Sequence, residues 1–134
     1  MTMLIKRLAH ICLGAVDLPK TIDFYCRLLG CRIVHEFRNP RGELYGVFLL
    51  VNNGTFLEFF QETAPKPPGG AFRHLCFEVE DINQAGESLR QAGFEVKIDR
   101  GKTDGALQCW VKDPDGNQVE FHQYDQKSVQ YKHL

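Results

Sequence analysis

The sequence predicts an α+β protein built from two βαβββ modules. Three observations lead to this prediction: a strand-and-helix pattern recurs in the second half of the chain, β-prone stretches follow each copy, and a Pro/Gly-rich segment separates the halves. A pattern that recurs with many matching offsets indicates an internal duplication. We expect the modules to form curved, mostly antiparallel sheets within one domain of 134 residues, a length sufficient for its own core.

The duplication is clearest when residues 9–30 are aligned with residues 73–93. The segment Ala-His-Ile-Cys-Leu in the first copy matches Arg-His-Leu-Cys-Phe in the second. An aspartate follows each histidine by seven residues and is a candidate N-cap for a helix. Apolar residues then recur at helical spacing until a glycine, which tolerates the left-handed conformation common after helices. Each half therefore begins with a strand and a helix.

Three further strands are expected in each module, and the predicted boundaries follow from them. The strands are residues 31–37, 44–51 and 55–61 in the first module, and 95–99, 107–112 and 118–123 in the second. Module one covers about residues 5–62, a linker covers 63–71, module two covers about 72–124, and a C-terminal tail covers 125–134. The polar composition of the tail favours mobility.

Composition and charge exclude several classes of function. A net charge of -1 gives no basic surface for nucleic acid, and no apolar run is long enough for a membrane span or a signal peptide. The five cysteines are odd in number and form no CxxC pair, which favours reduced thiols in the cytoplasm. We therefore expect a cytoplasmic protein with no nucleic-acid or membrane partner.

A tight turn precedes the last predicted strand. Residues 113–117 read Asp-Pro-Asp-Gly-Asn, in which Pro fixes φ, Gly tolerates a positive φ, and the Asp and Asn side chains bond the local backbone. In the strand that follows, Glu120 lies between two apolar residues and points to the opposite face from both. The turn therefore sets the position of a carboxylate.

One histidine and one glutamate recur at matching places in the two modules. Glu58 follows His10 by 48 residues, and Glu120 follows His74 by 46 residues. Each histidine lies on the first strand of its module and each glutamate on the last, so the four side chains converge if the modules form one curved sheet. Two imidazoles and two carboxylates suit Zn, Ni, Co, Mn or Fe and leave coordination positions open for substrate. The sequence predicts a catalytic metal site here.

Taken alone, any one of these four histidines and glutamates would more simply be explained as a structural residue. A histidine in a strand is more often a core or surface residue, and a strand glutamate more often lies on a solvated face. The duplicated spacing favours the metal site over both. His122 shares the strand face of Glu120 and is a weaker candidate, expected beside the site or on the surface. Cys12 and Cys76 are expected to be small buried thiols.

The chain resembles the vicinal oxygen chelate superfamily, and in particular its glyoxalase I-like members. The resemblance covers about residues 6–123, and the residues that carry it are His10, Phe24 and Tyr25 with Leu29 and Gly30, Glu58, His74, and the turn 113–117 leading to Glu120. It implies paired modules whose sheets surround a divalent metal, commonly in a homodimer. In some members of the superfamily, each site takes ligands from both chains.

The order His, Glu, His, Glu is that of glyoxalase I-like enzymes. It implies a lyase or isomerase that acts on a small α-oxygenated carbonyl compound, or its thiol adduct, through a metal-stabilised enediolate. Glu120 is the expected base and Glu58 the second choice. Two alternatives stay open. One is an Fe(II)-dependent extradiol-type dioxygenase that uses His10, His74 and Glu120, and the other is a non-catalytic binding or sequestering module.

The substrate-binding end of the site is less legible in the sequence. Lys102 matches a loop lysine of glutathione-dependent glyoxalases, and Arg100 adds positive charge nearby, although this loop could equally be a solvated basic turn. Phe60 and Trp110 are candidates for an apolar wall, and both could equally be core residues. Gly14 and Glu62 stand where glutathione-dependent enzymes commonly have Arg and Asn, so the use of glutathione stays open.

Overall fold

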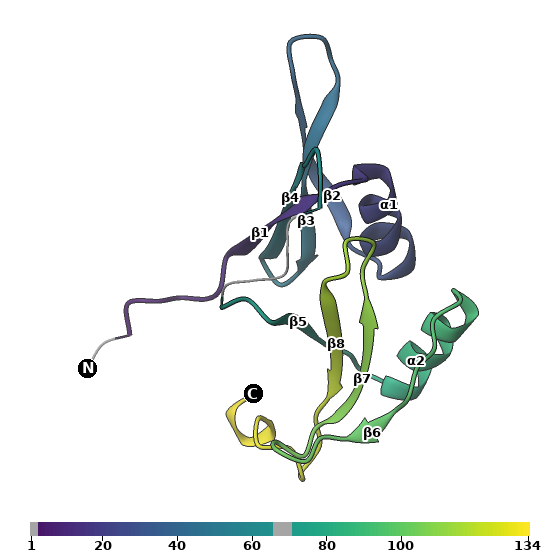
Figure 1. Ribbon diagram of the computed structural model, residues 1–134. Coiled ribbons are helices and arrows are strands. Elements are labelled where there is room, and N and C mark those ends of the chain that lie inside the picture. Colours follow the sequence, from purple (N-terminus) through teal and green to yellow (C-terminus); the bar gives the residue numbers. More distant parts are fainter. Residues whose placement is uncertain (1–2, 66–70) are drawn as a thin grey trace. The chain divides into compact units, whose positions relative to one another are not determined.

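The computed structural model describes residues 3–65 and 71–134 (Figure 1). Its contacts divide the chain into two compact units, residues 1–67 and residues 68–134, each with its own four-stranded sheet. The predicted α+β class is confirmed. Part of the predicted linker, residues 66–70, lies outside the described residues. No helix in the described part of the chain has the length and apolar composition needed to cross a membrane.

The first unit is a mixed sheet with one helical segment packed on it (Figure 1). The strand order is β1-β4-β3-β2, in which β1 is parallel to β4 and the other pairs are antiparallel. The strands are β1 (His10–Ala15), β2 (Arg32–Arg38), β3 (Leu44–Asn52) and β4 (Thr55–Gln61). The predicted strands of this module lie within one residue of these bounds at each end.

The helical segment of the first unit begins as an α-helix and ends as a π-helix. Asp17 caps α1 (Leu18–Ile22) by accepting a hydrogen bond from the backbone N–H of Lys20 at 3.1 Å. The wider turn η1 (Asp23–Leu28) follows, and it buries Tyr25 completely. The Tyr25 ring lies 4.8 Å from the ring of Phe59 on β4, centroid to centroid. The helical segment therefore covers the Phe59 face of the sheet, and Glu58 projects from the other face.

The second unit repeats this topology. The strand order is β5-β8-β7-β6, with β5 parallel to β8 and the other pairs antiparallel. Its elements are β5 (His74–Glu78), α2 (Ile82–Gln91), β6 (Asp99–Arg100), β7 (Leu107–Lys112) and β8 (Gln118–Gln123). Asp81 caps α2 by accepting hydrogen bonds from the N–H groups of Asn83 and Gln84. A short 3₁₀ turn, η2 (Tyr131–His133), ends the chain.

Helix α2 packs against β7 and β8 and defines the core face of this sheet. Ile82 and Leu89 on the helix and Val119 and Phe121 on β8 are buried. The side-chain oxygen of Gln123 accepts a hydrogen bond from the N–H of Ile82, which places the face of Val119, Phe121 and Gln123 toward the helix. Glu120 therefore points to the opposite face of β8.

The predicted strand 95–99 is wrong for most of its length, because only Asp99 and Arg100 pair with β7. The chain before them follows α2 instead. Arg90 on the helix donates a hydrogen bond to the carbonyl of Val96 at 2.9 Å. Ile98 occupies the space left at Gly86, where an added Cβ would lie 2.8 Å from the Ile98 side chain. Packing on the helix therefore replaces sheet pairing here.

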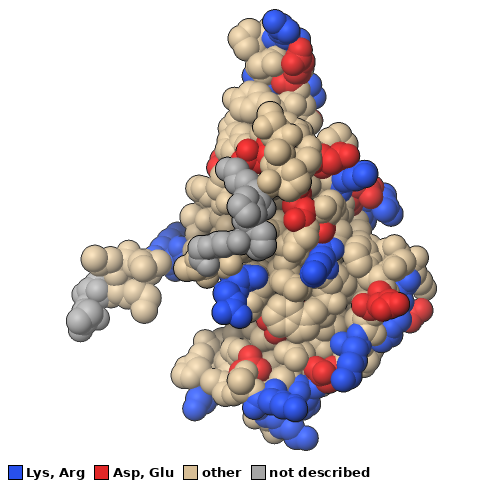
Figure 2. Space-filling model, in the orientation of Figure 1, with Lys and Arg blue, Asp and Glu red and all other residues tan. Residues whose placement is uncertain are grey.

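The surface carries both signs of charge. Figure 2 shows Lys and Arg side chains scattered among Asp and Glu side chains on the face that it displays. This pattern agrees with the net charge of -1.

Candidate metal centre

The two units hold their histidine and glutamate in the same strand register. In the first unit, His10 pairs with Phe56 and Cys12 with Glu58; in the second, His74 pairs with Gln118 and Cys76 with Glu120. Because side chains alternate along a strand, the His, Cys and Glu of each unit project from one face, opposite the helix. The duplication seen in the sequence is therefore also a duplication of geometry.

Glu120 lies between two histidines in the second unit. Its Oε2 atom is 3.0 Å from Nε2 of His74, and its Oε1 atom is hydrogen-bonded to Nε2 of His122. The Glu120 and His122 side chains are 6% and 7% exposed, whereas the His74 side chain is 40% exposed. The other ring nitrogen of His122 lies 3.2 Å from the hydroxyl of Tyr124. The Glu120 carboxylate is thus contacted on both oxygens, and the oxygen that faces His74 lies on the more solvent-accessible side.

The turn before β8 fixes the start of the strand that carries Glu120. Asp113 is 5% exposed, and its Oδ1 atom accepts hydrogen bonds from the N–H groups of Asp115 and Asn117, both at 2.9 Å. Its Oδ2 atom accepts a third from the Asn117 side chain. Gly116 has φ of 81°, a conformation that favours glycine. These bonds stabilise the turn that the sequence predicts.

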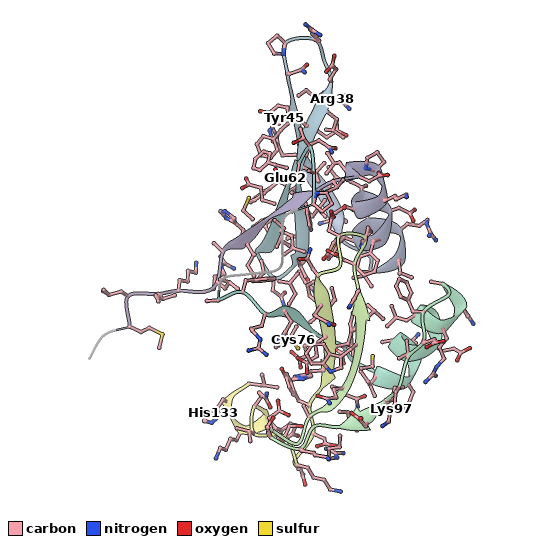
Figure 3. The ribbon with its side chains drawn as sticks, in the orientation of Figure 1. Arg38, Tyr45, Glu62, Cys76, Lys97 and His133 are labelled. Carbon is pink, nitrogen blue, oxygen red and sulfur yellow. The ribbon has the colours of Figure 1, made fainter. Side chains whose placement is uncertain are left out.

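A cluster of three potential metal ligands in the described residues consists of Cys76, Glu120 and His122, whose ligand atoms lie within 4.8 Å of one another. Burial, followed by the charge of Glu120 and a hydrogen bond to it, raises the pKa of the Cys76 thiol to about 12. Without a cation beside it, this thiol keeps its proton at neutral pH. Figure 3 labels Cys76 on β5.

In the first unit, the corresponding residues His10 and Glu58 have different surroundings. Glu58 is half-buried. The pKa of the Cys12 thiol is raised first by burial, and then by a hydrogen bond to Glu58 and the charge of the Glu58 carboxylate. The His10 ring is turned toward Phe48, edge to face, with ring centroids 5.5 Å apart. Phe60 occupies the register position that His122 has in the second unit. The first unit therefore has no second imidazole at that position to hold its glutamate.

A cavity of about 440 Å³ lies in the second unit beside these side chains. Besides His74, Cys76, Glu120 and His122, its walls contain Thr103, Asp104, Gln108, Trp110, Tyr124 and Gln130. The rings of Trp110 and His74 meet edge to face, with centroids 4.9 Å apart. Trp110 is thus the one predicted wall residue that the structure places in this cavity.

The other predicted substrate-binding residues have different surroundings. Arg100 donates hydrogen bonds to both carboxylate oxygens of Asp125, at 2.9 and 2.8 Å, and to the carbonyl of Gly105. Lys102 lies in the turn that follows β6 and, like Arg100, does not line the cavity. Phe60 stacks on Tyr45 in the first unit, with ring centroids 6.0 Å apart. Their roles toward a substrate stay predictions, and the contacts of Arg100 give its role no support.

The C-terminal tail is hydrogen-bonded to the rest of the second unit. The backbone N–H of Val129 donates to the carbonyl of Asp104 at 2.8 Å, and Nε2 of Gln130 donates to the Asp104 carboxylate at 2.9 Å. With the Arg100–Asp125 pair, these bonds dock the tail onto residues 100–106 (Figure 3, near the labelled His133). Polar side chains of the tail thus bond to this loop, and the mobility of the tail stays a prediction.

Sequence reasoning underrated His122 and missed Tyr124 and Gln130. The position of His122, two residues beyond Glu120 on one strand face, was the available signal. Nothing in the sequence pattern marks Gln130, since its place in the cavity depends on how the tail docks.

Comparison with known proteins gives consistent matches over most of the chain. The family model described as "Glyoxalase/Bleomycin resistance protein/Dioxygenase superfamily" matches residues 7–121. The chain is 31% identical to the virulence protein STM3117 of Salmonella typhimurium, over 91% of this chain and 87% of that protein. It is also 31% identical to a lactoylglutathione lyase of Neisseria meningitidis, over 87% of this chain and 90% of that enzyme.

Solved structures show the same fold. A glyoxalase family protein from Enterococcus faecalis superimposes with a TM-score of 0.75 at 27% identity, covering 90% of this chain and 99% of that one. TnmS3, an antibiotic binding protein from Streptomyces sp. CB03234, superimposes with a TM-score of 0.69 at 23% identity, covering 92% of this chain and 100% of that one.

Proposed function

Because this chain belongs to the Glyoxalase/Bleomycin resistance protein/Dioxygenase superfamily, we propose that it is a metal-dependent lyase or isomerase. Its substrate would be a small α-oxygenated carbonyl compound or the thiol adduct of one. The observation that carries the proposal is the Glu120 carboxylate, buried at a cavity wall, with one oxygen facing His74 and the other held by His122. The similarity to lactoylglutathione lyases supports the same reaction class.

The residues present fit a divalent cation. A ring nitrogen of His74 and a carboxylate oxygen of Glu120 lie 3.0 Å from each other. This pairing of donor types suits Zn, Ni, Co, Mn or Fe. We propose that His10 and Glu58 complete the ligand set, from the same chain or from the second chain of a homodimer. When bound, the cation would act as a Lewis acid toward two adjacent substrate oxygens and stabilise an enediolate.

Glu120 is the residue that we assign to proton transfer. Its Oε2 atom lies on the accessible side, where it would take a proton from one substrate carbon and return it to the next. His122 would keep the carboxylate in place through Oε1 during both transfers. Trp110 would limit the access of water to the reacting carbons. Glu58 is the second candidate for the base.

A metal-by-substrate screen tests the proposal. Protein purified without chelators is analysed for metal and then assayed with methylglyoxal and several thiols, followed by α-hydroxycarbonyl compounds. We expect close to one equivalent of a divalent metal per site; less than about 0.2 equivalents, with no uptake of added Zn, Ni, Co or Mn, would contradict the metal site, since such donor sets bind these ions tightly.

The variant Glu120→Gln separates an enzyme from a binding module. For an enzyme we expect turnover to fall by about 10²–10⁴, the range usual for loss of a general base. Glu87→Gln is the matched control, because that glutamate is 62% exposed on α2. A non-catalytic module predicts no substrate consumption by any form and unchanged ligand affinity in Glu120→Gln. Oxygen uptake with a catechol, dependent on ferrous iron, would instead identify a dioxygenase.

Location and assembly are further expectations of the proposal. We propose a cytoplasmic location, because five cysteines without a CxxC pair favour reduced thiols. We propose a homodimer, which light scattering on the purified protein would test. Mixed dimers of His10→Ala and His74→Ala chains would then report whether each metal site takes ligands from both chains. Activity that is regained on mixing requires sites built from two chains.

A further inference from the structure

We infer that Tyr124 is a positioning residue for the proposed base Glu120. It donates a hydrogen bond to Nδ1 of His122 and thereby keeps the His122 proton on Nε2, where this proton faces Glu120. The inference rests on the proposed function, because it concerns the same carboxylate. Three observations lead to it: the order of contacts from Glu120 to Tyr124, the acceptor-only chemistry of a carboxylate, and the anchoring of the residue that follows Tyr124.

Glu120, His122 and Tyr124 are linked by contacts through the His122 ring. They lie two residues apart, on β8 and just beyond its end, so they follow one strand face. Each ring nitrogen of His122 has one contact: Nε2 with Oε1 of Glu120, and Nδ1 with the Tyr124 hydroxyl at 3.2 Å. The two rings meet edge to face, with centroids 5.4 Å apart. The buried imidazole therefore connects a carboxylate to a phenol.

The chemistry of the three groups sets the direction of both hydrogen bonds. An ionised carboxylate has no proton to donate. As the proposed base, Glu120 is ionised before it takes the substrate proton, so Oε1 accepts and Nε2 of His122 donates. A neutral imidazole with its proton on Nε2 has a lone pair on Nδ1, and the Tyr124 hydroxyl is the donor beside it. The opposite tautomer would turn a lone pair of Nε2 toward Oε1, and Glu120 would lose this hydrogen bond.

The Tyr124 hydroxyl has the proton that this role needs. Burial, followed by the charges of neighbouring acidic groups that include Glu120, raises the pKa of Tyr124 above its ordinary value of 10.0. The phenol therefore stays protonated at neutral pH and can donate to Nδ1. Oε2 of Glu120 takes no part in these contacts and stays directed toward His74, on the side of the proposed cation.

The residue after Tyr124 is held in place by side-chain hydrogen bonds. Both carboxylate oxygens of Asp125 accept from Arg100 on β6, at 2.9 and 2.8 Å. The backbone N–H of Asp125 donates to the Ser128 hydroxyl at 3.0 Å. These bonds fix the chain where it leaves β8 and so keep the Tyr124 hydroxyl beside His122. They give Arg100 a structural role at this site.

The first unit has no equivalent of this arrangement at the matching positions. Phe60 has the register position of His122, and Glu62 follows it two residues later, as Tyr124 follows His122. Neither of these first-unit residues is an imidazole or a phenol. Among the matching positions of the two units, the tautomer control that we infer therefore applies to Glu120 and not to Glu58. This difference agrees with Glu120 as the first candidate for the base.

Nuclear magnetic resonance of the full-length protein, before and after loading with Zn, tests the tautomer directly. The ring ¹⁵N shifts of His122 distinguish the Nε2–H form, the Nδ1–H form and the cation. We expect the Nε2–H form, and we expect Tyr124→Phe to lower its ratio to the Nδ1–H form by about two- to tenfold, the effect of one lost hydrogen bond. Tyr131→Phe is the matched control, because Tyr131 is 47% exposed in the same tail. A wild-type ring in the Nδ1–H or cationic form, or an unchanged ratio in Tyr124→Phe, would overturn the inference.

A double-mutant cycle tests whether Tyr124 acts through His122. We expect Tyr124→Phe to weaken Zn or Co binding by about two- to tenfold, measured by competition with a chromophoric chelator. In the His122→Leu background, the same substitution should cause no further loss, since the linking imidazole is absent. Equal losses in both backgrounds would show that Tyr124 acts independently of His122 and would overturn the positioning role.

These measurements separate the inference from the proposed reaction, because the tautomer is read without turnover. No turnover of any substrate, together with a Tyr124-dependent Nε2–H form, would refute the lyase and support the assignment of Tyr124. Turnover by a protein whose His122 is in the Nδ1–H form would support the lyase and refute this assignment.

Discussion

Nε2 of His122 is hydrogen-bonded to Oε1 of Glu120, and the two buried side chains form one unit with Tyr124. In metal sites, ligating carboxylates are commonly held by such a neighbour, whose loss typically costs 10–100-fold in metal affinity or activity. His122 thus positions Glu120 while leaving Oε2 directed toward His74.

Replacing His122 should weaken metal binding without removing a direct ligand. We expect His122→Leu to lower the affinity for Zn or Co by about 10–100-fold, measured by competition with a chromophoric chelator. His122→Gln can still donate to Glu120 and should lose clearly less. His35→Leu serves as the control, because His35 lies on β2 against Phe37. Equal losses in the Leu and Gln variants would contradict a positioning role.

The turn before β8 should be a strong determinant of stability. Asp113→Ala removes three acceptor contacts from a buried carboxylate, and we expect the free energy of unfolding to fall by about 2–3 kcal/mol. Denaturant unfolding measured by far-ultraviolet circular dichroism checks this value. Asp113→Asn keeps one oxygen acceptor and should cost less than half as much. A loss below about 0.5 kcal/mol in the alanine variant, the level of ordinary surface substitutions, would show that the strand starts without this network.

Docking of the C-terminal tail should depend on pH through Asp125. Its bond to Arg100 lowers the pKa of the Asp125 carboxyl to about 2, below the ordinary value of about 3.9. A carboxyl whose pKa is lowered on folding contributes stability above the unfolded value and loses it as the pH falls through the folded value. The tail should therefore stay docked at neutral pH and loosen as the pH falls from about 4 to about 2.

The amide of Val129 reports this loosening, because it donates to the carbonyl of Asp104. We expect Asp125→Asn at pH 7 to lower the protection of this amide against hydrogen exchange, measured relative to the intrinsic exchange rate at the same pH, as acid should do in the unmodified chain. Asp23→Asn is the control: Asp23 also pairs with an arginine, Arg27, in the first unit, and its pKa is also lowered. Unchanged exchange at Val129 in Asp125→Asn would contradict the role of the pair.

The sequence alone predicted the features that repeat or follow local rules. Strands β4, β7 and β8 begin and end at the predicted residues, since alternation and flanking turns define them. The segment 95–98 escaped prediction because Arg90 and the space at Gly86 draw it onto α2, a tertiary effect. Gln130 escaped for the same reason, as its position follows from hydrogen bonds to Asp104. The duplicated His and Glu pattern was legible in the sequence, and the part of the cavity wall that the docked tail contributes was not.

The difference between the two units predicts unequal roles for the two glutamates. Phe60 stands beside Glu58 where His122 stands beside Glu120, so only Glu120 is held by an imidazole at that register position. In metal-saturated protein, we expect Glu120→Gln to lower kcat by about 10²–10⁴ and Glu58→Gln to lower it by about tenfold, the second acting mainly on metal affinity. Exchange of the substrate carbon-bound proton with deuterium from solvent should disappear only in Glu120→Gln. The reverse order of kcat losses, with exchange abolished in Glu58→Gln, would assign the base to the first unit.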